Sequence, residues 1–334
     1  MASSEFSLEN ALNAIGRAGT RPGVVPEEAH LNRSPRHHDR YVSVTMEFRC
    51  NLKCVHCMIE GTMDRLNAVP DAEFEAICAD QAETGRWTGL ILTGSEITLR
   101  KDLDQIAKKA RAAGFRHIQI QTHGMHLGRT DYADRLVEAG IDEFFVSVAG
   151  SDRQTHDDIT QVQGAWDKMM AGLCHLDRYD HVRILTNSVV TTRSYALLPD
   201  MVAALSHLKR LIQMEFWTFF PMREDDPKGL MASFSDIRPY LLRAIGDARA
   251  LGRRVEVKNF PECLLDGYRD TLVNAQATLM IDPAFWEEFD RNAFYGCPHQ
   301  ESCQSRECLG LTRAYLDKFG SDHDPLLPVL TKNK

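Results

Sequence analysis

Short runs of apolar and β-branched residues alternate along the chain with longer stretches in which apolar residues recur at helical spacing. The runs predict six strands, over residues 41–48, 90–93, 117–122, 144–148, 182–190 and 214–220. The longer stretches predict helices over residues 72–83, 103–113, 132–139, 166–176, 198–208 and 235–251. Because strands that alternate with helices build parallel sheets with right-handed crossovers, the pattern predicts an α/β fold whose sheet closes fully or partly into a barrel.

The same pattern divides the chain into three parts. Residues 1–40 have little periodicity and predict an irregular polar lead-in. Residues 41–225 hold the six predicted strands and the first five predicted helices. In residues 226–334 a last helix is followed by segments in which the alternation ends, so we expect a small C-terminal domain there.

Composition and charge exclude several classes of function. The chain has 334 residues, of which 43% are apolar and 26% charged, which is ordinary for a globular protein. No apolar run approaches the length that crosses a bilayer. A net charge of -8 gives no general attraction for nucleic acid. We therefore expect a soluble cytoplasmic protein with neither a membrane nor a nucleic acid as partner.

Three closely spaced cysteines, Cys50, Cys54 and Cys57, directly follow the first predicted strand. Such thiolates suit a metal cluster, and three of them on a four-iron cluster leave one iron without a protein ligand. A structural zinc site is the main alternative, although no fourth cysteine follows at matching spacing and His56 is the nearby candidate. A disulfide is disfavoured because nine cysteines is an odd number and no signal peptide is recognised.

The C-x3-C-x2-C spacing, with the ring of His56 just before the third cysteine, resembles the radical S-adenosylmethionine (SAM) enzymes. The resemblance implies a 4Fe-4S cluster on Cys50, Cys54 and Cys57, SAM at its open iron, and a partial (β/α)6 TIM-type barrel. In such barrels the loops at the carboxyl ends of the strands build the site. It also implies a one-electron donor such as flavodoxin or ferredoxin as a partner.

Polar residues follow the later strands in the order that this family uses to bind SAM. Gly94, Ser95 and Glu96 resemble the Gly-Gly-Glu element that holds the SAM amino group, with Ser95 replacing the second glycine. The resemblance implies these cofactor-binding residues: His56, Gly94, Ser95, Glu96, Thr122, Ser147, Asn187 and Ser188. Turn formation, helix capping and sheet-end hydrogen bonding are the structural alternatives for them.

Two further groups of polar residues lie near the predicted barrel mouth. Asp152, Arg153 and His156 follow the fourth strand and are candidates to grip a substrate, or else belong to a plain surface loop. His123 and His126 follow the third strand, and we expect them to be solvent-facing loop histidines.

A second set of cysteines lies in the C-terminal part: Cys263, Cys297, Cys303 and Cys308. Four thiolates complete the ligation of a 4Fe-4S cluster, which then serves electron transfer or structure, and a zinc knot is the alternative. The region resembles the Twitch and SPASM auxiliary-cluster extensions of radical SAM enzymes. The two remaining cysteines, Cys78 and Cys174, fall in predicted outer helices, and we expect both to be small buried apolar side chains.

The resemblance implies that a 5'-deoxyadenosyl radical abstracts a hydrogen atom from a substrate carbon. Neither remaining cysteine is placed to return a hydrogen atom, whereas a second cluster offers an electron sink. We therefore expect a dehydrogenase acting on a small molecule, for instance an alcohol carbon of a sugar or cyclitol in a biosynthetic pathway. A peptide-modifying enzyme, an epimerase and a non-enzymatic zinc-binding module are the alternatives.

Overall fold

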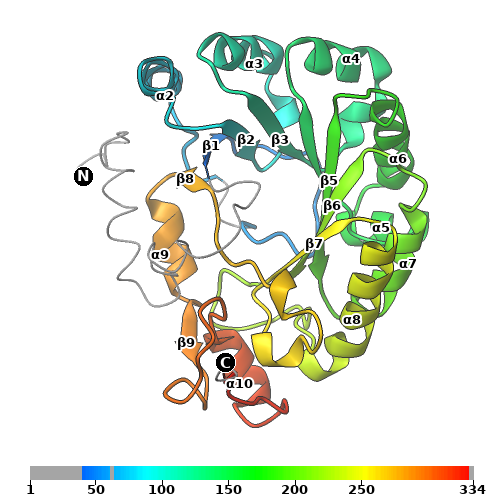
Figure 1. The fold of residues 1–334 in the computed structure, drawn as a ribbon, viewed down its shortest axis with the longest axis vertical. Coiled ribbons are helices and arrows are strands. Elements are labelled where there is room, and N and C mark those ends of the chain that lie inside the picture. The colour runs from blue at the N-terminus through cyan, green and yellow to red at the C-terminus, as the bar shows by residue number, and fades with distance from the viewer. Residues whose placement is uncertain (1–39, 61–63, 331–334) are drawn as a thin grey trace.

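A computed structural model describes residues 40–60 and 64–330 of the chain. Its main feature is an eight-stranded parallel sheet with the strand order β7-β6-β5-β4-β3-β2-β1-β8. The strands are β1 (Tyr41–Glu47), β2 (Gly89–Gly94), β3 (His117–Thr122), β4 (Glu143–Ser147), β5 (Arg183–Val190), β6 (Leu211–Thr218), β7 (Arg254–Lys258) and β8 (Thr278–Met280). The sheet curls into an open ring with helices outside it (Figure 1), a partial TIM-type barrel.

The helices mostly coincide with the predicted ones. They are α2 (Asp71–Thr84), α3 (Leu103–Ala112), α4 (Thr130–Glu138), α5 (Arg153–Thr160), α6 (Ala165–Leu176), α7 (Leu198–Ala204), α8 (Phe234–Ala250), α9 (Ala284–Asp290) and α10 (Arg313–Phe319). A two-stranded antiparallel sheet joins β9 (Phe294–Gly296) to β10 (Leu311–Thr312). Figure 1 shows α9, β9 and α10 together beside β8, on the side of the ring opposite α3 and α4.

Each strand separates two environments because successive side chains point to opposite faces. In β1, Val42, Val44 and Met46 belong to the apolar core between sheet and helices, whereas the intervening Ser43 and Thr45 are buried on the inner face. Buried polar side chains also occupy the inner positions of other strands, namely Gln119, Glu143, Gln213, Glu215, Glu256 and Lys258. The barrel interior is therefore polar, as a binding site for a polar ligand requires.

The six predicted strands are confirmed as β1 to β6, in the predicted order. The expectation that the alternation ends after the sixth strand was wrong, because β7 pairs in parallel with β6 and β8 pairs in parallel with β1. Both strands lie at the sheet edges. Strand β8 has only three residues, too few to show an alternation, whereas β7 alternates charged and valine residues over five positions, a signal that the prediction did not use. The parallel sheet thus extends well beyond residue 225.

The amino-terminal ends of the strands are held together by a buried ionic group. The Tyr41 hydroxyl donates a 2.8 Å hydrogen bond to Glu143 Oε1, and Arg183 contacts the same carboxylate at 2.6 Å. Arg183 also contacts Asp142 at 3.2 Å. Ionic packing at this end of a parallel barrel serves stability, since the functional loops lie at the opposite end.

The predicted lead-in over residues 1–40 lies outside the described residues, apart from Arg40. None of the helices in the described ranges combines the length and hydropathy that a membrane crossing needs.

Candidate functional site

The loop that carries Cys50, Cys54 and Cys57 lies at the carboxyl end of β1. Its backbone pairs with the end of α5: the Lys53 N–H donates to the Thr160 carbonyl at 3.1 Å, and the Val55 N–H donates to the Ile159 carbonyl at 2.9 Å. On another side, Lys228 Nζ donates to the Val55 carbonyl at 3.1 Å. The loop is therefore fixed by segments that follow β4 and β6.

The three thiols of this loop are partly buried and lie close enough to influence one another. Burial, together with the neighbouring Cys57 and Cys50, raises the pKa of the Cys54 thiol to about 12. Among the described residues, no three cysteine sulfurs lie within 4.8 Å of one another. Tetrahedral zinc, with Zn–S bonds of about 2.3 Å, would bring its sulfurs to roughly 3.8 Å. The three sulfurs are thus not gathered as closely as a zinc ion would hold them.

Gly94 allows β1 and β2 to approach closely at the carboxyl edge of the sheet. A Cβ atom at this position would lie 1.9 Å from the Glu47 carbonyl oxygen. The Ser95 N–H donates a 2.8 Å hydrogen bond to the same oxygen. The glycine is thus required by contact with the neighbouring strand, and it places the Ser95 side chain at the mouth of the barrel.

The Glu96 carboxylate is fully buried and accepts hydrogen bonds from two neighbouring loops. One oxygen accepts from the Thr122 hydroxyl at 2.7 Å and from the Thr98 N–H at 3.0 Å, and the other accepts from the His123 N–H at 2.8 Å. The His123 ring also hydrogen-bonds Asn51 at 2.7 Å. Glu96 therefore ties the loops after β2 and β3 to the cysteine loop.

The expectation that His123 faces solvent was wrong, because its exposed fraction is only 7%. His126 is half-buried, and its ring lies 3.1 Å from the Thr98 hydroxyl. Sequence pattern could not reveal this, since Glu96 and Asn51, which bring His123 inward, come from other loops.

Three of the predicted cofactor-binding residues carry a buried polar atom without a hydrogen-bond partner among the described residues. They are His56 Nδ1, Ser95 Oγ and Asn187 Oδ1. Buried polar atoms in native proteins are nearly always paired, so these three positions fit a ligand that supplies polar groups. Ser147 is exposed at the end of β4, whereas Ser188 is buried and points to the opposite face from Asn187.

The segment with Asp152, Arg153 and His156 is a helix and not the predicted loop. Asp152 caps α5 by accepting the Thr155 N–H at 2.9 Å, as N-cap aspartates do. Arg153 is exposed and pairs with Asp167. His156 is 1% exposed, and its Nδ1 accepts the Ala149 N–H at 3.2 Å.

The Nε2 atom of His156 has no partner among the described residues. Burial lowers the pKa of His156 to about 4 and the pKa of His56 also to about 4, and each positive charge would further be opposed by a neighbouring histidine. Both rings are therefore neutral, and the electrostatic influence of His156 on His56 places it beside the cysteine loop.

The second set of cysteines is also assembled by the fold. Cys263 follows β7, Cys297 follows β9, and Cys303 and Cys308 lie in the loop between β9 and β10. The thiols of Cys263, Cys297 and Cys303 lie near enough to interact electrostatically, and burial raises the pKa of Cys308 to about 11. Backbone N–H groups point at the sulfurs, for instance from Val329 to Cys303 at 3.3 Å. Such donors are typical of iron–sulfur sites.

A buried charged group on the inner face of β6 and β7 was not singled out by the sequence pattern. Lys258 Nζ lies 3.0 Å from Glu256 and 3.9 Å from Glu215 Oε2, and Trp217 Nε1 donates to Glu215 at 2.7 Å. Lys258 Nζ also lies 5.9 Å from the centre of the Trp217 ring. The sequence signal for this group was the presence of polar residues at every second position of β6 and β7, which places them on one face of the sheet.

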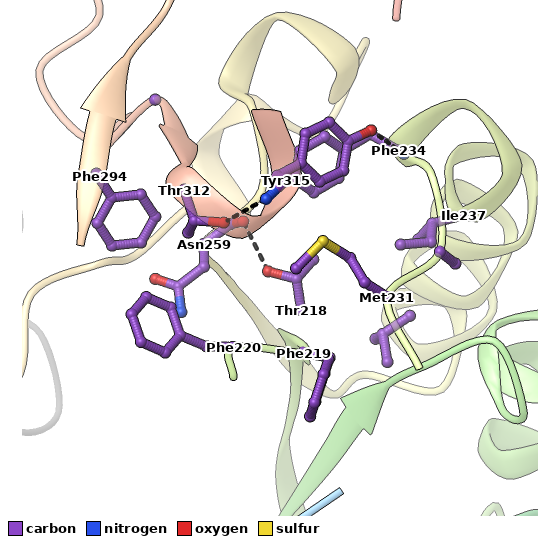
Figure 2. Close-up of a pocket in the computed structure, with 13 residues that line it drawn as sticks. Thr218, Phe219, Phe220, Met231, Phe234, Ile237, Asn259, Phe294, Thr312 and Tyr315 are labelled. Carbon is purple, nitrogen blue, oxygen red and sulfur yellow. Dashed lines mark hydrogen bonds between the residues drawn. The ribbon is translucent and has the colours of Figure 1, made fainter. Parts of the chain in front are cut away.

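A small cavity lies between these strands and the C-terminal segments (Figure 2). Its volume of about 20 Å³ suits a single water molecule. Asn259, the residue directly after β7, lines it together with Phe220 and Phe294, and has a left-handed φ of 58°. Non-glycine residues in this conformation occur mostly where the surrounding structure enforces it.

The two remaining cysteines lie on the outer helices, as predicted, but their environments differ. Cys78 is half-buried on α2 against the core, whereas Cys174 on α6 is exposed. The expectation of a buried apolar role was therefore wrong for Cys174. Neither helix contributes to the inner face of the sheet.

Comparison with known proteins agrees with this geometry. Residues 45–192 match the Radical SAM superfamily. The chain is 31% identical over 172 residues to a probable GTP 3',8-cyclase of Methanopyrus kandleri, which covers 52% of this chain and 54% of that protein. It is 34% identical over 146 residues to an Fe-coproporphyrin III synthase of Methanosarcina barkeri, covering 43% and 36%. The chain thus spans about half, or less, of the curated relatives it matches.

Solved structures share the fold at low sequence identity. The Streptococcus suis protein SuiB, bound to its precursor peptide SuiA, has a TM-score of 0.54 at 16% identity, with 65% of this chain and 48% of that chain covered. The protein anSMEcpe, bound to SAM and a peptide, has a TM-score of 0.51 at 14% identity, covering 65% and 63%. The cysteine loop, the barrel and the sequence match agree, and this chain contains a radical SAM domain.

Proposed function

We propose that this protein is a radical SAM enzyme that holds a 4Fe-4S cluster on Cys50, Cys54 and Cys57. The observation that carries the proposal is the convergence of these thiols with unpaired polar atoms of His56, Ser95 and Asn187 at one edge of the barrel. When bound, the cluster and SAM supply a 5'-deoxyadenosyl radical that abstracts a hydrogen atom from the substrate.

The residues around the cysteine loop bind and orient SAM. Ser95 Oγ and Asn187 Oδ1 gain hydrogen-bond partners when SAM is bound, because each is otherwise buried and unpaired. Glu96 acts mainly as a positioning residue, since both of its oxygens already accept protein hydrogen bonds. Glu96 holds the loops after β2 and β3 in position relative to the cysteine loop.

The reaction that we propose is a net two-electron oxidation of an alcohol carbon. Loss of one hydrogen atom from the carbon, followed by loss of a proton from the hydroxyl group and of one electron, would convert the alcohol to a carbonyl. Cys263, Cys297, Cys303 and Cys308 would hold a second 4Fe-4S cluster, which would accept this electron. A one-electron donor such as flavodoxin or ferredoxin supplies the electron that cleaves SAM.

Glu215 is the group that we propose accepts this proton. Burial raises the pKa of Glu215, the nearby Lys258 opposes that effect, and Glu256 reinforces it. A carboxylate with a raised pKa is a more effective base at neutral pH than an ordinary one. Because Trp217 and Lys258 surround it on the inner face, this part of β6 and β7 is the proposed substrate side of the barrel.

The substrate that we propose is a small polyol such as a sugar or cyclitol. The buried polar inner face supports a polar ligand, and the location of Cys78 and Cys174 outside the sheet argues against a cysteine that returns a hydrogen atom, as an epimerase would need. The relatives' names point to a nucleotide and a porphyrin, and one neighbour holds a peptide. Those similarities cover the radical SAM part or the fold alone and do not carry over a substrate.

The first test compares iron and sulfide content after anaerobic reconstitution. We expect about eight irons in the wild type and about four in the Cys50→Ala/Cys54→Ala/Cys57→Ala variant, with reductive SAM cleavage lost in the variant. The matched control is the Cys78→Ala/Cys174→Ala variant, which should keep the wild-type iron content and full cleavage. Zinc without iron would overturn the proposal, and about four irons in the wild type that vanish in the triple variant would remove the second cluster from it.

A further inference from the structure

A segment near the end of the described chain, residues 326–329, crosses the four-cysteine site as a strap. The Gln304 N–H donates a 2.7 Å hydrogen bond to the Val329 carbonyl, and His299 Nε2 lies 2.9 Å from the Leu326 carbonyl oxygen. Because a carbonyl only accepts, His299 carries its proton on Nε2 in this contact. The strap is thus bonded at both ends to the loop that carries Cys297 and Cys303.

Two backbone N–H groups of the strap point at cysteine sulfurs. The Val329 N–H donates to Cys303 Sγ at 3.3 Å, and the Leu327 N–H donates to Cys263 Sγ. The strap therefore joins two cysteines that lie far apart in the chain.

The side chains explain only part of this arrangement. Val329 is 7% exposed and packs inward, whereas Leu327 is 66% exposed. The Leu327 backbone is therefore held beside the sulfur without burial of its own side chain. Its contribution to the site is the N–H group.

We propose that the strap is a potential-setting part of the second cluster, in which the N–H groups of Leu327 and Val329 stabilise the reduced cluster and make it a better electron acceptor. This inference rests on the proposed function, which places a 4Fe-4S cluster on these four cysteines. Reduction adds one negative charge to the cluster, and N–H dipoles directed at its sulfurs favour the more negative state. The electron that reduces the cluster is the one lost by the substrate radical, and the proton that the substrate radical loses goes to Glu215.

The test uses proline to delete single N–H groups, because proline has no backbone donor. All variants are made in the Cys50→Ala/Cys54→Ala/Cys57→Ala background, so that only the second cluster contributes iron and the EPR signal. Leu327→Pro is compared with Leu327→Ala, which loses the same exposed side chain but keeps the N–H. Val329→Pro is compared with Val329→Ala in the same way.

The measurement is a redox titration of the cluster followed by EPR, together with the iron content of each variant. We expect both proline variants to keep about four irons and to have a lower reduction potential than their alanine partners. The ratio of reduced to oxidised cluster at a fixed potential should fall by about threefold to tenfold, as expected for the net contribution of one typical hydrogen bond.

The failures of the two proposals are distinguishable. Equal potentials in the proline and alanine variants, with iron retained, would overturn the role of the strap and leave the second cluster in place. Absence of iron from the background protein itself would overturn the second cluster, and the strap proposal with it. Loss of iron from the proline variants alone would show that the strap holds the cluster without tuning it, which also overturns the proposal.

Discussion

The Val55 N–H donates a 2.9 Å hydrogen bond to the carbonyl of Ile159, so the cysteine loop after β1 is attached to the last turn of α5. The start of the same helix is packed against the segment that follows β4, where a Cβ atom on Gly150 would lie 2.5 Å from the backbone nitrogen of His156. Direct contacts therefore connect the segment after β4 to α5, and α5 to the cysteine loop.

Gly150→Ala should displace α5 and, through it, the cysteine loop. The added methyl group meets backbone atoms, which cannot move aside as a flexible side chain can, so we expect a loss of about 1–3 kcal/mol in the free energy of unfolding. The iron content of the first cluster should fall, whereas the iron content of the second cluster should stay at the wild-type level. Urea unfolding and iron counting check this, with the neighbouring Ser151→Ala as control; unchanged values in Gly150→Ala would contradict the coupling.

His156 should make the protein less stable in mild acid. Its pKa is lowered to about 4 by burial, Asp157 partly opposes this, and His123 adds to it. In the unfolded chain this histidine becomes protonated below about pH 6.5, whereas in the folded protein it stays neutral down to about pH 4. The free energy of unfolding is therefore unaffected by this group above pH 6.5 and decreases as the pH falls from 6.5 toward 4. The contribution is up to about 1.4 kcal/mol per pH unit.

Urea unfolding between about pH 5 and pH 7.5 measures this effect as a slope. The His156→Gln variant, which cannot titrate in this range, should have a shallower slope than the wild type. Since His56 titrates similarly, the difference between the two slopes is the quantity of interest. Parallel slopes would mean that His156 is not buried in its neutral form.

Glu215→Gln should separate radical formation from product formation. The amide keeps the hydrogen bonds to Gln213 and Trp217 within reach but cannot accept a proton at neutral pH. SAM cleavage should continue, whereas the yield of oxidised product per 5'-deoxyadenosine should fall by about 100-fold, the usual contribution of a general base. Product analysis by mass spectrometry tests this once a polyol substrate is found; unchanged coupling would remove Glu215 from the mechanism.

Arg183→Met should reduce stability without affecting the chemistry. It removes the Arg183 contact at 2.6 Å from the fully buried Glu143 carboxylate, and breaking a buried ion pair costs about 3–5 kcal/mol. Because this group lies at the amino-terminal ends of the strands, iron content and SAM cleavage per folded molecule should stay at wild-type levels. Arg129→Met, which removes an exposed pair with Asp131, is the control and should cost under about 1 kcal/mol.

Cys78→Ala/Cys174→Ala should leave the outcome of the reaction unchanged as well as the iron content. Cys174 is exposed on α6 and Cys78 is half-buried on α2, both outside the sheet. Neither can reach a substrate inside the barrel. In deuterated water, no deuterium should enter a carbon of the substrate recovered from either the wild type or the double variant. Deuterium that enters the substrate with the wild type but not with the double variant would favour an epimerase.

The sequence by itself determined the alternation of strands and helices and the position of the cysteine loop. Apolar periodicity is local, and each of β1 to β6 is long enough to display it. The cysteine spacing is local too, which is why the sequence alone assigns Cys50, Cys54 and Cys57 to one site. Strand β8, with three residues, offered too few positions for the same inference, whereas β7 alternates charged residues with Val255 and Val257 over five residues and carried a usable signal.

The tertiary structure decided which polar residues meet. His123 is drawn inward by Glu96 and Asn51, and α5 holds a cysteine loop that lies much earlier in the chain. The Lys258 and Glu215 pair likewise exists only because β6 and β7 are neighbours in the sheet. Such contacts join residues far apart in sequence, and no local pattern encodes them, because they depend on how the whole chain buries its apolar surface.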